Sequence, residues 1–171
     1  WRDDGRELAL AHNGNLTNAV ELYNELTEQG LKLRGTSDSE IIAALLSRRA
    51  GEGHEWIEDA VAEVMPRLEG AYSTVVMTKH AVVAFRDPHG VRPLALGKIK
   101  ASDEAGECFV VASESCAFDI IGAKLIREVQ TGEMVSLTEG GFSIWLGVAG
   151  FVIWASLMVV GGWLIRNGER P

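Results

Sequence analysis

The sequence predicts an α+β domain in which helices come first and a largely antiparallel set of strands follows. Two observations predict this class: apolar residues recur at helical spacing in the first part of the chain, and β-branched runs separated by turn residues follow Gly70. A third observation sets the end of the domain, because residues 140–165 contain no charged side chain and no histidine. We therefore expect a domain at 1–139, an apolar tract at 140–165 and a polar tail at 166–171.

The first strand and helix are expected close to the N-terminal end of the sequence. Residues 8–14 form an apolar run that predicts a buried strand, which ends in a tight turn at its Asn-Gly pair. A helix is expected to begin near Asn18, with Glu21 as the partner in a capping box, and to end at Gly30.

Two further helices complete the helical part. The second is expected to open at Ser37, which pairs with Glu40 in another capping box, and to end at residues 51–53. The third is expected over residues 55–68. The apolar positions expected to face the core are Ala19, Leu22, Tyr23, Leu26, Ile41, Ile42, Leu45, Leu46, Ile57, Ala60, Val61, Val64 and Leu68. Strands are then expected at 71–77, 81–85, 94–98, 108–112, 126–129 and 134–137.

The apolar tract at 140–165 predicts a transmembrane helix, because about 20 apolar residues suffice to span a bilayer. Trp145 and Trp163 lie near its ends, as interfacial aromatic residues do, and Arg166 closes it. A buried core helix and a foreign segment, introduced by a frameshift or gene fusion, are the alternatives.

Composition excludes several classes of protein. A net charge of −8 without a long basic run argues against a nucleic-acid partner. No phosphate-binding glycine loop is present. The two cysteines, Cys108 and Cys116, cannot form a disulfide framework, which indicates a reducing compartment and a cytoplasmic domain. The histidines lack metal-ligand spacing; they are His12, His54, His80 and His89.

Three residues are candidates for a substrate site. Asn13 and Gly14 predict either a tight turn or an oxyanion hole, in which the Asn amide and the Gly N–H donate to a developing negative charge. Asp38, at a helix start, is explained either by the helix dipole or by pairing with the ammonium group of an amino acid. Cys116 is interpreted as a core thiol rather than a nucleophile.

Five motifs, in this order, resemble one family. They are His12-Asn13-Gly14-Asn15-Leu16-Thr17-Asn18, Thr36-Ser37-Asp38-Ser39-Glu40, Leu68-Glu69-Gly70-Ala71-Tyr72-Ser73, Arg86-Asp87-Pro88-His89-Gly90-Val91-Arg92-Pro93-Leu94 and Ala112-Ser113-Glu114-Ser115-Cys116-Ala117. Over residues 8–138 the chain resembles the glutaminase domain of class II glutamine amidotransferases, most closely the amidophosphoribosyltransferase family.

The resemblance implies an Ntn-hydrolase fold, a four-layer αββα sandwich that this chain would form incompletely. It implies that Asn13 and Gly14 form the oxyanion hole and that Asp38 binds glutamine. The parent enzyme would pass ammonia to phosphoribosyl pyrophosphate in purine synthesis, with magnesium and, in some members, an iron–sulfur cluster. The parent would be a homo-oligomer, and no cofactor is expected in this chain itself.

The family's nucleophile is an N-terminal cysteine whose amino group serves as base, whereas residue 1 here is Trp. We therefore expect an internal fragment that lacks the nucleophile and the phosphoribosyltransferase domain and is inactive alone. The alternatives are another class II amidotransferase, or a non-catalytic module of the same fold that is inserted in a membrane through residues 140–165.

Overall fold

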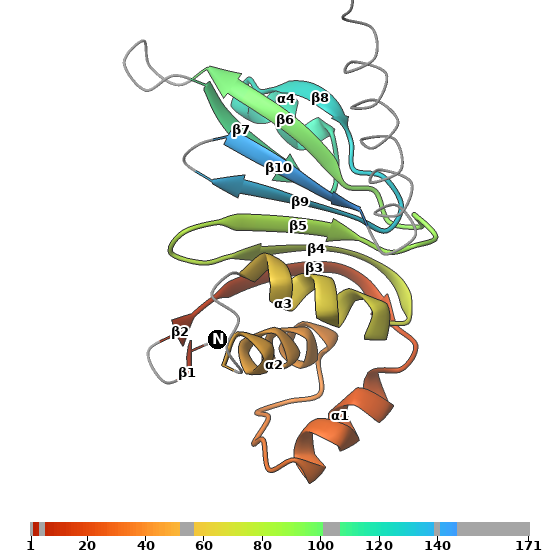
Figure 1. Ribbon diagram of the computed structural model, residues 1–171. Helices are drawn as coiled ribbons and strands as arrows, with labels where there is room; N and C mark the ends of the chain where they lie inside the picture. The colour runs from red at the N-terminus through yellow and green to blue at the C-terminus, as the bar shows by residue number, and fades with distance from the viewer. Residues whose placement is uncertain (1, 4–5, 52–56, 101–106, 139–140, 147–171) are drawn as a thin grey trace, which may run out of the picture.

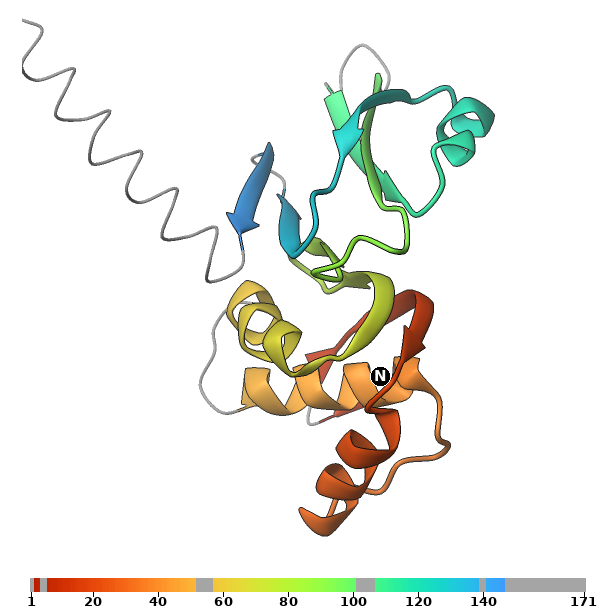
Figure 2. The ribbon, with the colours of Figure 1, turned by 90° about the vertical axis from the view of Figure 1, so that its right-hand side faces the viewer.

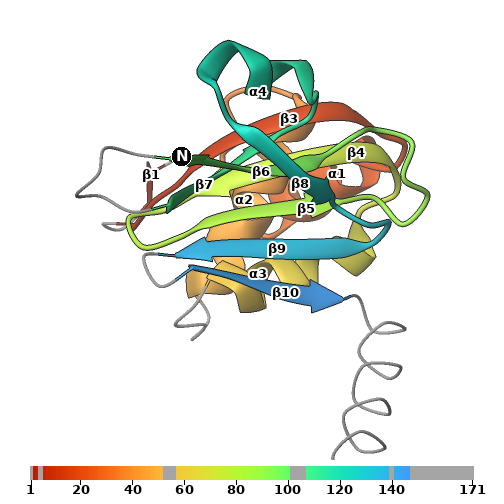
Figure 3. The ribbon, with the colours of Figure 1, turned by 90° about the horizontal axis from the view of Figure 1, so that it is seen from above.

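The structure is a computed structural model that describes residues 2–3, 6–51, 57–100, 107–138 and 141–146. These residues form three layers (Figure 1): a group of helices, a five-stranded sheet and a three-stranded sheet. Figure 2 shows the first three helices of the chain and the three-stranded sheet on opposite sides of the five-stranded sheet. In Figure 3 the three-stranded sheet crosses over the larger one, with the first three helices of the chain beneath.

The helices are α1 (Ala19–Glu28), α2 (Asp38–Gly51), α3 (Ile57–Val64) and α4 (Cys116–Ile121), and a 3₁₀ turn, η1 (Met65–Arg67), follows α3. The five-stranded sheet has the spatial order β10 (Gly141–Leu146), β9 (Glu133–Thr138), β5 (Val82–Arg86), β4 (Gly70–Met77), β3 (Ala9–Leu16). The three-stranded sheet has the order β7 (Glu107–Ala112), β6 (Ala95–Lys100), β8 (Lys124–Glu128). A short hairpin of β1 (Arg2–Asp3) and β2 (Arg6–Glu7) precedes them.

Every strand pairing within the described residues is antiparallel, which confirms the predicted α+β class. The six strands expected after Gly70 are all present, with ends displaced by one or two residues, as is usual for strand boundaries. Among the described residues, the helical layer expected on the outside of the second sheet is represented by α4 alone, a helix of 6 residues.

The main core lies between the helices and the five-stranded sheet. Helix α2 lies at its centre, because it packs against β3 on one side and against α1 and α3 on others. Every residue from Ile41 to Ser47 is buried, so α2 buries its whole circumference rather than the single apolar face that its sequence suggests. From the sheet, alternate residues of β4 and β5 point into this core, namely Tyr72, Val76, Val83 and Phe85.

A second apolar cluster joins the two sheets. It is built from Ala84, Leu94, Leu96, Val129, Val135 and Leu137. Since successive side chains of a strand point to opposite faces, β5 and β9 contribute residues to both clusters. The five-stranded sheet is therefore covered on both faces.

The predicted capping boxes differ from the observed contacts. Asn18 is the N-cap of α1, but its side chain makes no capping hydrogen bond. The Asn18 amide instead donates to the Arg67 carbonyl (2.9 Å) and accepts the Glu69 N–H (3.2 Å), which ties the start of α1 to the start of β4. The capping box with Glu21 is therefore wrong, because a distant segment of chain competes for the same side chain.

The second box is half confirmed. The Ser37 hydroxyl accepts the Glu40 N–H at 3.3 Å, as the motif predicts. A capping box also requires the Glu40 carboxylate to accept the Ser37 N–H. It accepts the N–H groups of Arg34 (2.6 Å) and Gly35 (2.8 Å) instead. The third helix ends at Val64 rather than residue 68, and the chain continues as the 3₁₀ turn η1.

The apolar tract does not begin as a helix. Residues 141–146 form β10, which pairs antiparallel with β9, with Phe142 opposite Leu137. The predicted transmembrane helix over 140–165 is thus wrong for these residues, because a short apolar run does not distinguish a strand from a helix. Residues 147–165 and the tail 166–171 lie outside the described residues. Within the described part of the chain, no helix is long and apolar enough to cross a membrane.

A buried polar contact links the helix layer to the sheet. The Ser136 hydroxyl of β9 donates to the Glu58 carboxylate of α3 at 2.6 Å, and both residues are buried. The other Glu58 oxygen is buried without a hydrogen-bond partner. A buried carboxylate costs free energy when its donors are lost, so this contact is important for the docking of α3.

We predict that Ser136→Ala destabilises the protein by about 1–3 kcal/mol, because the Glu58 carboxylate then has no donor in its buried position. Denaturant unfolding followed by circular dichroism measures the change. Ser115→Ala is the matched control, since Ser115 is exposed and makes no side-chain cap hydrogen bond. Equal stabilities of the two variants would show that the Glu58 contact contributes nothing.

Candidate active site at the edge of the five-stranded sheet

The Asn-Gly pair lies inside a strand and not in a turn. Asn13 and Gly14 belong to β3, opposite Ser73 and Tyr72 of β4. The interpretation of this dipeptide as a tight turn is therefore wrong. The pair is placed on the outermost strand of the five-stranded sheet, next to an edge that no described strand covers.

The hydrogen-bond pattern of β3 determines where the Gly14 N–H points. The Thr17 N–H donates to the Glu69 carbonyl at 2.8 Å, and in an antiparallel pair such bonds recur at every second residue. Gly14 lies an odd number of residues from Thr17, so it belongs to the set of β3 residues that do not bond to β4. Its opposite residue, Tyr72, is bonded to β5 instead, since the Tyr72 carbonyl accepts the Asp87 N–H at 2.9 Å. The Gly14 N–H therefore points out of the open edge of β3.

Only glycine fits at position 14. Its φ is +145°, and a Cβ built there would lie 2.0 Å from the Ala71 carbonyl oxygen and 2.8 Å from the Tyr72 Cα. Gly70 has the same relation to β3, because its Cβ would lie 2.3 Å from the Asn15 carbonyl oxygen. At both glycines, therefore, the backbone of the partner strand occupies the space that a side chain would need.

Asp38 reaches the same edge from α2. Its Oδ2 accepts the Leu16 N–H at 2.8 Å, which is the outward-facing N–H two residues beyond Gly14. At about 3.4 Å per residue, the N–H groups of Gly14 and Leu16 are about 7 Å apart. The fold therefore brings the three residues predicted from sequence, Asn13, Gly14 and Asp38, to one end of one strand edge.

The Asn13 side chain belongs to the face of the sheet that is turned away from the helices. Leu10 and Leu16 of the same strand pack in the helix-side core, and Asn13 lies an odd number of residues from each, so it faces the other way. Ser73, directly across from Asn13, is buried, and its hydroxyl has no hydrogen-bond partner. Asn13 and Gly14 thus present different groups at adjacent positions: a side-chain amide on this face and a backbone N–H in the plane of the sheet.

His12 lies beneath the site on the helix side. Its Nε2 is buried without a partner, and burial lowers the pKa of the imidazole. The carboxylate of Asp38 opposes this shift of the pKa, and the charge of Arg92 adds to it. His12 is therefore held neutral near pH 7, as a packed residue and not as a charged one.

The other candidate groups are not part of this site. Cys108 and Cys116 are exposed, and they belong to β7 and α4. The interpretation of Cys116 as a core thiol is therefore wrong. In the part of the chain that the structure describes, no three His, Cys, Asp or Glu side chains are grouped to hold a metal ion.

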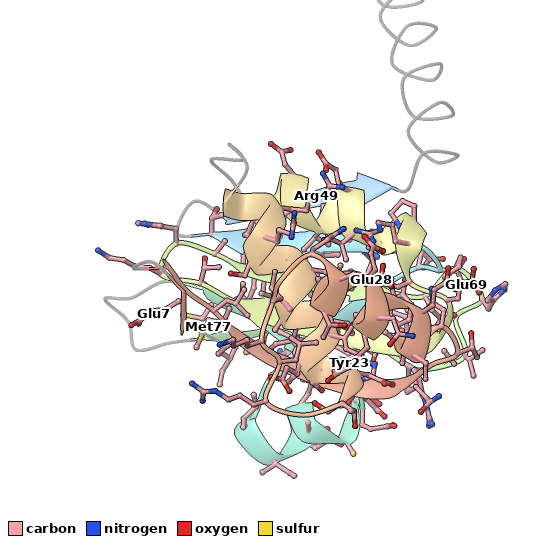
Figure 4. All side chains as sticks on the ribbon, turned by 90° about the horizontal axis from the view of Figure 1, so that it is seen from below. Glu7, Tyr23, Glu28, Arg49, Glu69 and Met77 are labelled. Atoms are coloured by element: carbon pink, nitrogen blue, oxygen red, sulfur yellow. The ribbon has the colours of Figure 1, made fainter. Side chains whose placement is uncertain are left out.

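A groove of about 1330 Å³ runs beside the first half of β3. Leu8, Leu10, Leu31, Ala43 and Met77 form much of its apolar lining. Figure 4 shows Glu7 and Met77 together at this end of the β3–β4 pair, with Glu69 at the other end. The groove does not include Asn13, Gly14 or Asp38, but Ser37 and Ser39, which flank Asp38, line it.

The motif from Arg86 to Leu94 organises the loop after β5, a role that the sequence did not reveal. The Arg86 guanidinium donates to three carbonyls, those of Gly90 (2.8 Å), Arg92 (2.7 Å) and Val129 (2.8 Å). Asp87 is fully buried, and its Oδ1 accepts the His89 N–H at 2.8 Å. An Asp-Pro-x-Gly string is typical of a turn in which the Asp side chain bonds nearby backbone, so a local signal existed.

The chain is similar to known glutamine amidotransferases. A family profile described as "Glutamine amidotransferase domain" matches residues 1–119. An amidophosphoribosyltransferase of Synechococcus elongatus is 41% identical over 138 residues, which cover 81% of this chain and 27% of that protein. The amidophosphoribosyltransferase of Bacillus subtilis is 42% identical over 134 residues, which cover 78% of this chain and 26% of that protein. The chain thus spans about a quarter of the length of these curated relatives.

Solved structures similar to this chain include proteins of the same family. The B. subtilis glutamine phosphoribosylpyrophosphate amidotransferase, complexed with ADP and GMP, superposes with a TM-score of 0.74 at 39% identity. The match covers 85% of this chain and 30% of that one. A glutamine aminotransferase class-II domain protein from Silicibacter pomeroyi superposes with a TM-score of 0.55 at 16% identity, a likeness of fold alone, over 81% of this chain and 65% of that one.

We predict that Gly14→Ala destabilises the protein by about 3 kcal/mol or more, because unfavourable φ and the collision with Ala71 add together. Gly30→Ala is the control. Gly30 also has a positive φ, +88°, but a Cβ at this position would meet nothing within 4 Å, so only the cost of its φ, about 1–2 kcal/mol, remains. Denaturant unfolding of both variants measures the difference, and similar losses would contradict the close approach of β3 and β4.

Proposed function

The chain belongs to the glutamine amidotransferase domain family, and from this premise we propose that Asn13, Gly14 and Asp38 bind glutamine as the receiving side of its hydrolysis. One observation carries the proposal: the Gly14 N–H points out of the open edge of β3, where Asp38 is anchored through Leu16. The carboxamide oxygen of glutamine would accept hydrogen bonds from the Asn13 amide and the Gly14 N–H, and its ammonium group would pair with the Asp38 carboxylate.

The separation along β3 suits an extended amino acid. The N–H groups of Gly14 and Leu16 are about 7 Å apart, and glutamine carries its ammonium and carboxamide groups at opposite ends of an aliphatic chain. Two donors aimed at one oxygen would stabilise the negative charge that develops when the amide carbonyl is attacked, by roughly 3 kcal/mol per donor. Asp38 fixes the other end, so that the carbonyl is oriented toward those donors.

We propose that the chain is part of an amidophosphoribosyltransferase, a longer protein that transfers the ammonia released from glutamine to phosphoribosyl pyrophosphate. The identities of 41% and 42% with two proteins of that name support this choice within the family. The magnesium, the iron–sulfur cluster and the homo-oligomer that the resemblance implies belong to that longer protein, and they stay predictions.

The 171 residues by themselves are proposed to bind glutamine without hydrolysing it. Hydrolysis in this family needs a thiol beside the oxyanion donors. The thiols of this chain, Cys108 and Cys116, belong to β7 and to helix α4, and both are exposed.

We predict that Asp38→Asn weakens glutamine binding at least about tenfold, because the charge-assisted contact with the ammonium group is lost. Asn retains an oxygen that can accept the Leu16 N–H, so the fold is preserved. Backbone amide NMR of the chain, titrated with L-glutamine, measures the affinity and should show shifts at Asn13, Gly14 and Leu16.

Asp119→Asn, which removes an exposed carboxylate from α4, is the matched control and should bind as the wild type does. An unchanged affinity of Asp38→Asn would remove Asp38 from the site. Glutamine-induced shifts confined to other parts of the chain would reject the site as a whole.

We predict that a diazoketone analogue of glutamine, which alkylates the nucleophilic thiol of glutaminases, leaves the chain unmodified under conditions that saturate the site. Intact-mass spectrometry measures the outcome. An iodoacetamide reaction serves as the control, because it should alkylate the exposed Cys108 and Cys116. Saturable, glutamine-protected labelling of either cysteine would show that the chain has a working nucleophile.

A further inference from the structure

Asp87 is a fully buried carboxylate that the proposed glutamine site does not use directly. Its Oδ1 accepts the N–H groups of His89 (2.8 Å) and Val91 (3.4 Å), and its Oδ2 accepts the N–H of Tyr72 at 3.2 Å. A carboxylate that is buried without a cation must be compensated by such donors. Two of the three donors belong to its own turn, whereas Tyr72 belongs to β4.

The contact with Tyr72 replaces a bond of the β4–β5 ladder. Tyr72 and Asp87 stand opposite each other just beyond the last paired residues, and the Asp87 N–H donates to the Tyr72 carbonyl at 2.9 Å. The ordinary reciprocal acceptor for Tyr72 would be the Asp87 carbonyl. That carbonyl is turned away, since it accepts the N–H groups of Gly90 (3.2 Å) and Gly132 (3.0 Å). The Asp87 side chain therefore accepts the Tyr72 N–H in place of the Asp87 backbone carbonyl.

Tyr72 is also the residue opposite Gly14. Both backbone groups of Tyr72 are engaged with Asp87, so neither is available to Gly14. The Tyr72 Cα lies so close to Gly14 that a Cβ on Gly14 would be 2.8 Å from it, which means that any movement of the Tyr72 backbone is transmitted to Gly14. The position of the Gly14 N–H is thus set from two strands away.

We propose that Asp87 is a positioning residue for the oxyanion donor: by holding the Tyr72 N–H on the β5 side, it keeps the Gly14 N–H directed out of the sheet edge. Its role in catalysis rests on the proposed function, whereas its effect on the Gly14 backbone does not. Asp87 acts through Tyr72 and touches no substrate.

The test uses Asp87→Asn in the full 171-residue chain. The amide oxygen of Asn meets two donors on the side of His89 and Val91 but only one on the side of Tyr72, so the NH₂ group should face the Tyr72 N–H and break that bond. Arg86→Lys is the matched control. It weakens the same loop at the carbonyls of Gly90 and Val129 and leaves the Tyr72 contact intact.

The first measurement needs no ligand. In backbone amide NMR, Asp87→Asn should shift the signals of both Tyr72 and Gly14, whereas Arg86→Lys should shift only those of the loop. In the wild type, the Tyr72 amide should exchange with solvent deuterium at least about tenfold more slowly than the Gly14 amide. If Asp87→Asn folds and its Gly14 signal is unmoved, the proposal is overturned. If the variant does not fold, the wild type decides: a Gly14 amide that exchanges as slowly as the Tyr72 amide overturns the proposal.

The second measurement separates positioning from general destabilisation. L-2-aminobutyrate carries the ammonium group of glutamine but no carboxamide. Asp87→Asn should lower the preference for glutamine over aminobutyrate about tenfold and leave aminobutyrate binding unchanged, while Arg86→Lys should leave the preference unchanged. Equal weakening for both ligands would show a merely structural role for Asp87. If wild-type protein has no preference for glutamine, the proposed function fails, and the Gly14 signal still decides the role of Asp87.

Discussion

The close approach of β3 and β4 is the constraint on which the rest of the structure depends. At Gly14 and Gly70 each backbone lies so near the other strand that a methyl group would overlap its atoms. This contact fixes the register of the two strands, and the register in turn decides which N–H groups face the neighbouring strand and which face the open edge. The helix-side core and the candidate oxyanion donors both follow from that choice.

Two carboxylates accept backbone N–H groups of β3 and β4 that have no backbone carbonyl opposite them. Asp38 accepts the Leu16 N–H on the outer side of β3, and Asp87 accepts the Tyr72 N–H on the inner side of β4. Each takes the place of a backbone carbonyl, and each secures a strand next to Gly14. A site of this kind requires strands that are held firmly but not fully paired, since a fully paired Gly14 would have no N–H to offer a substrate.

The order and type of the elements could be predicted from the sequence, because apolar spacing distinguishes helices such as α2 from strands such as β4. The errors arose where distant groups compete with local ones. Asn18 bonds Arg67 and Glu69 instead of capping α1, and the apolar residues 141–146 pair with β9 instead of starting a helix. Local propensity carries no information about such partners.

The sequence by itself determined which residues form the candidate site, since the Asn-Gly pair and Asp38 occur in motifs that match a glutamine amidotransferase family. Only the tertiary structure decided how those residues are used. Leu16 and Asp38 are 22 positions apart, and Tyr72 and Asp87 are 15 apart, so no local pattern relates them. The direction of the Gly14 N–H depends on strand register, and register is established only when β3 and β4 come together at Gly14 and Gly70, which no local pattern encodes.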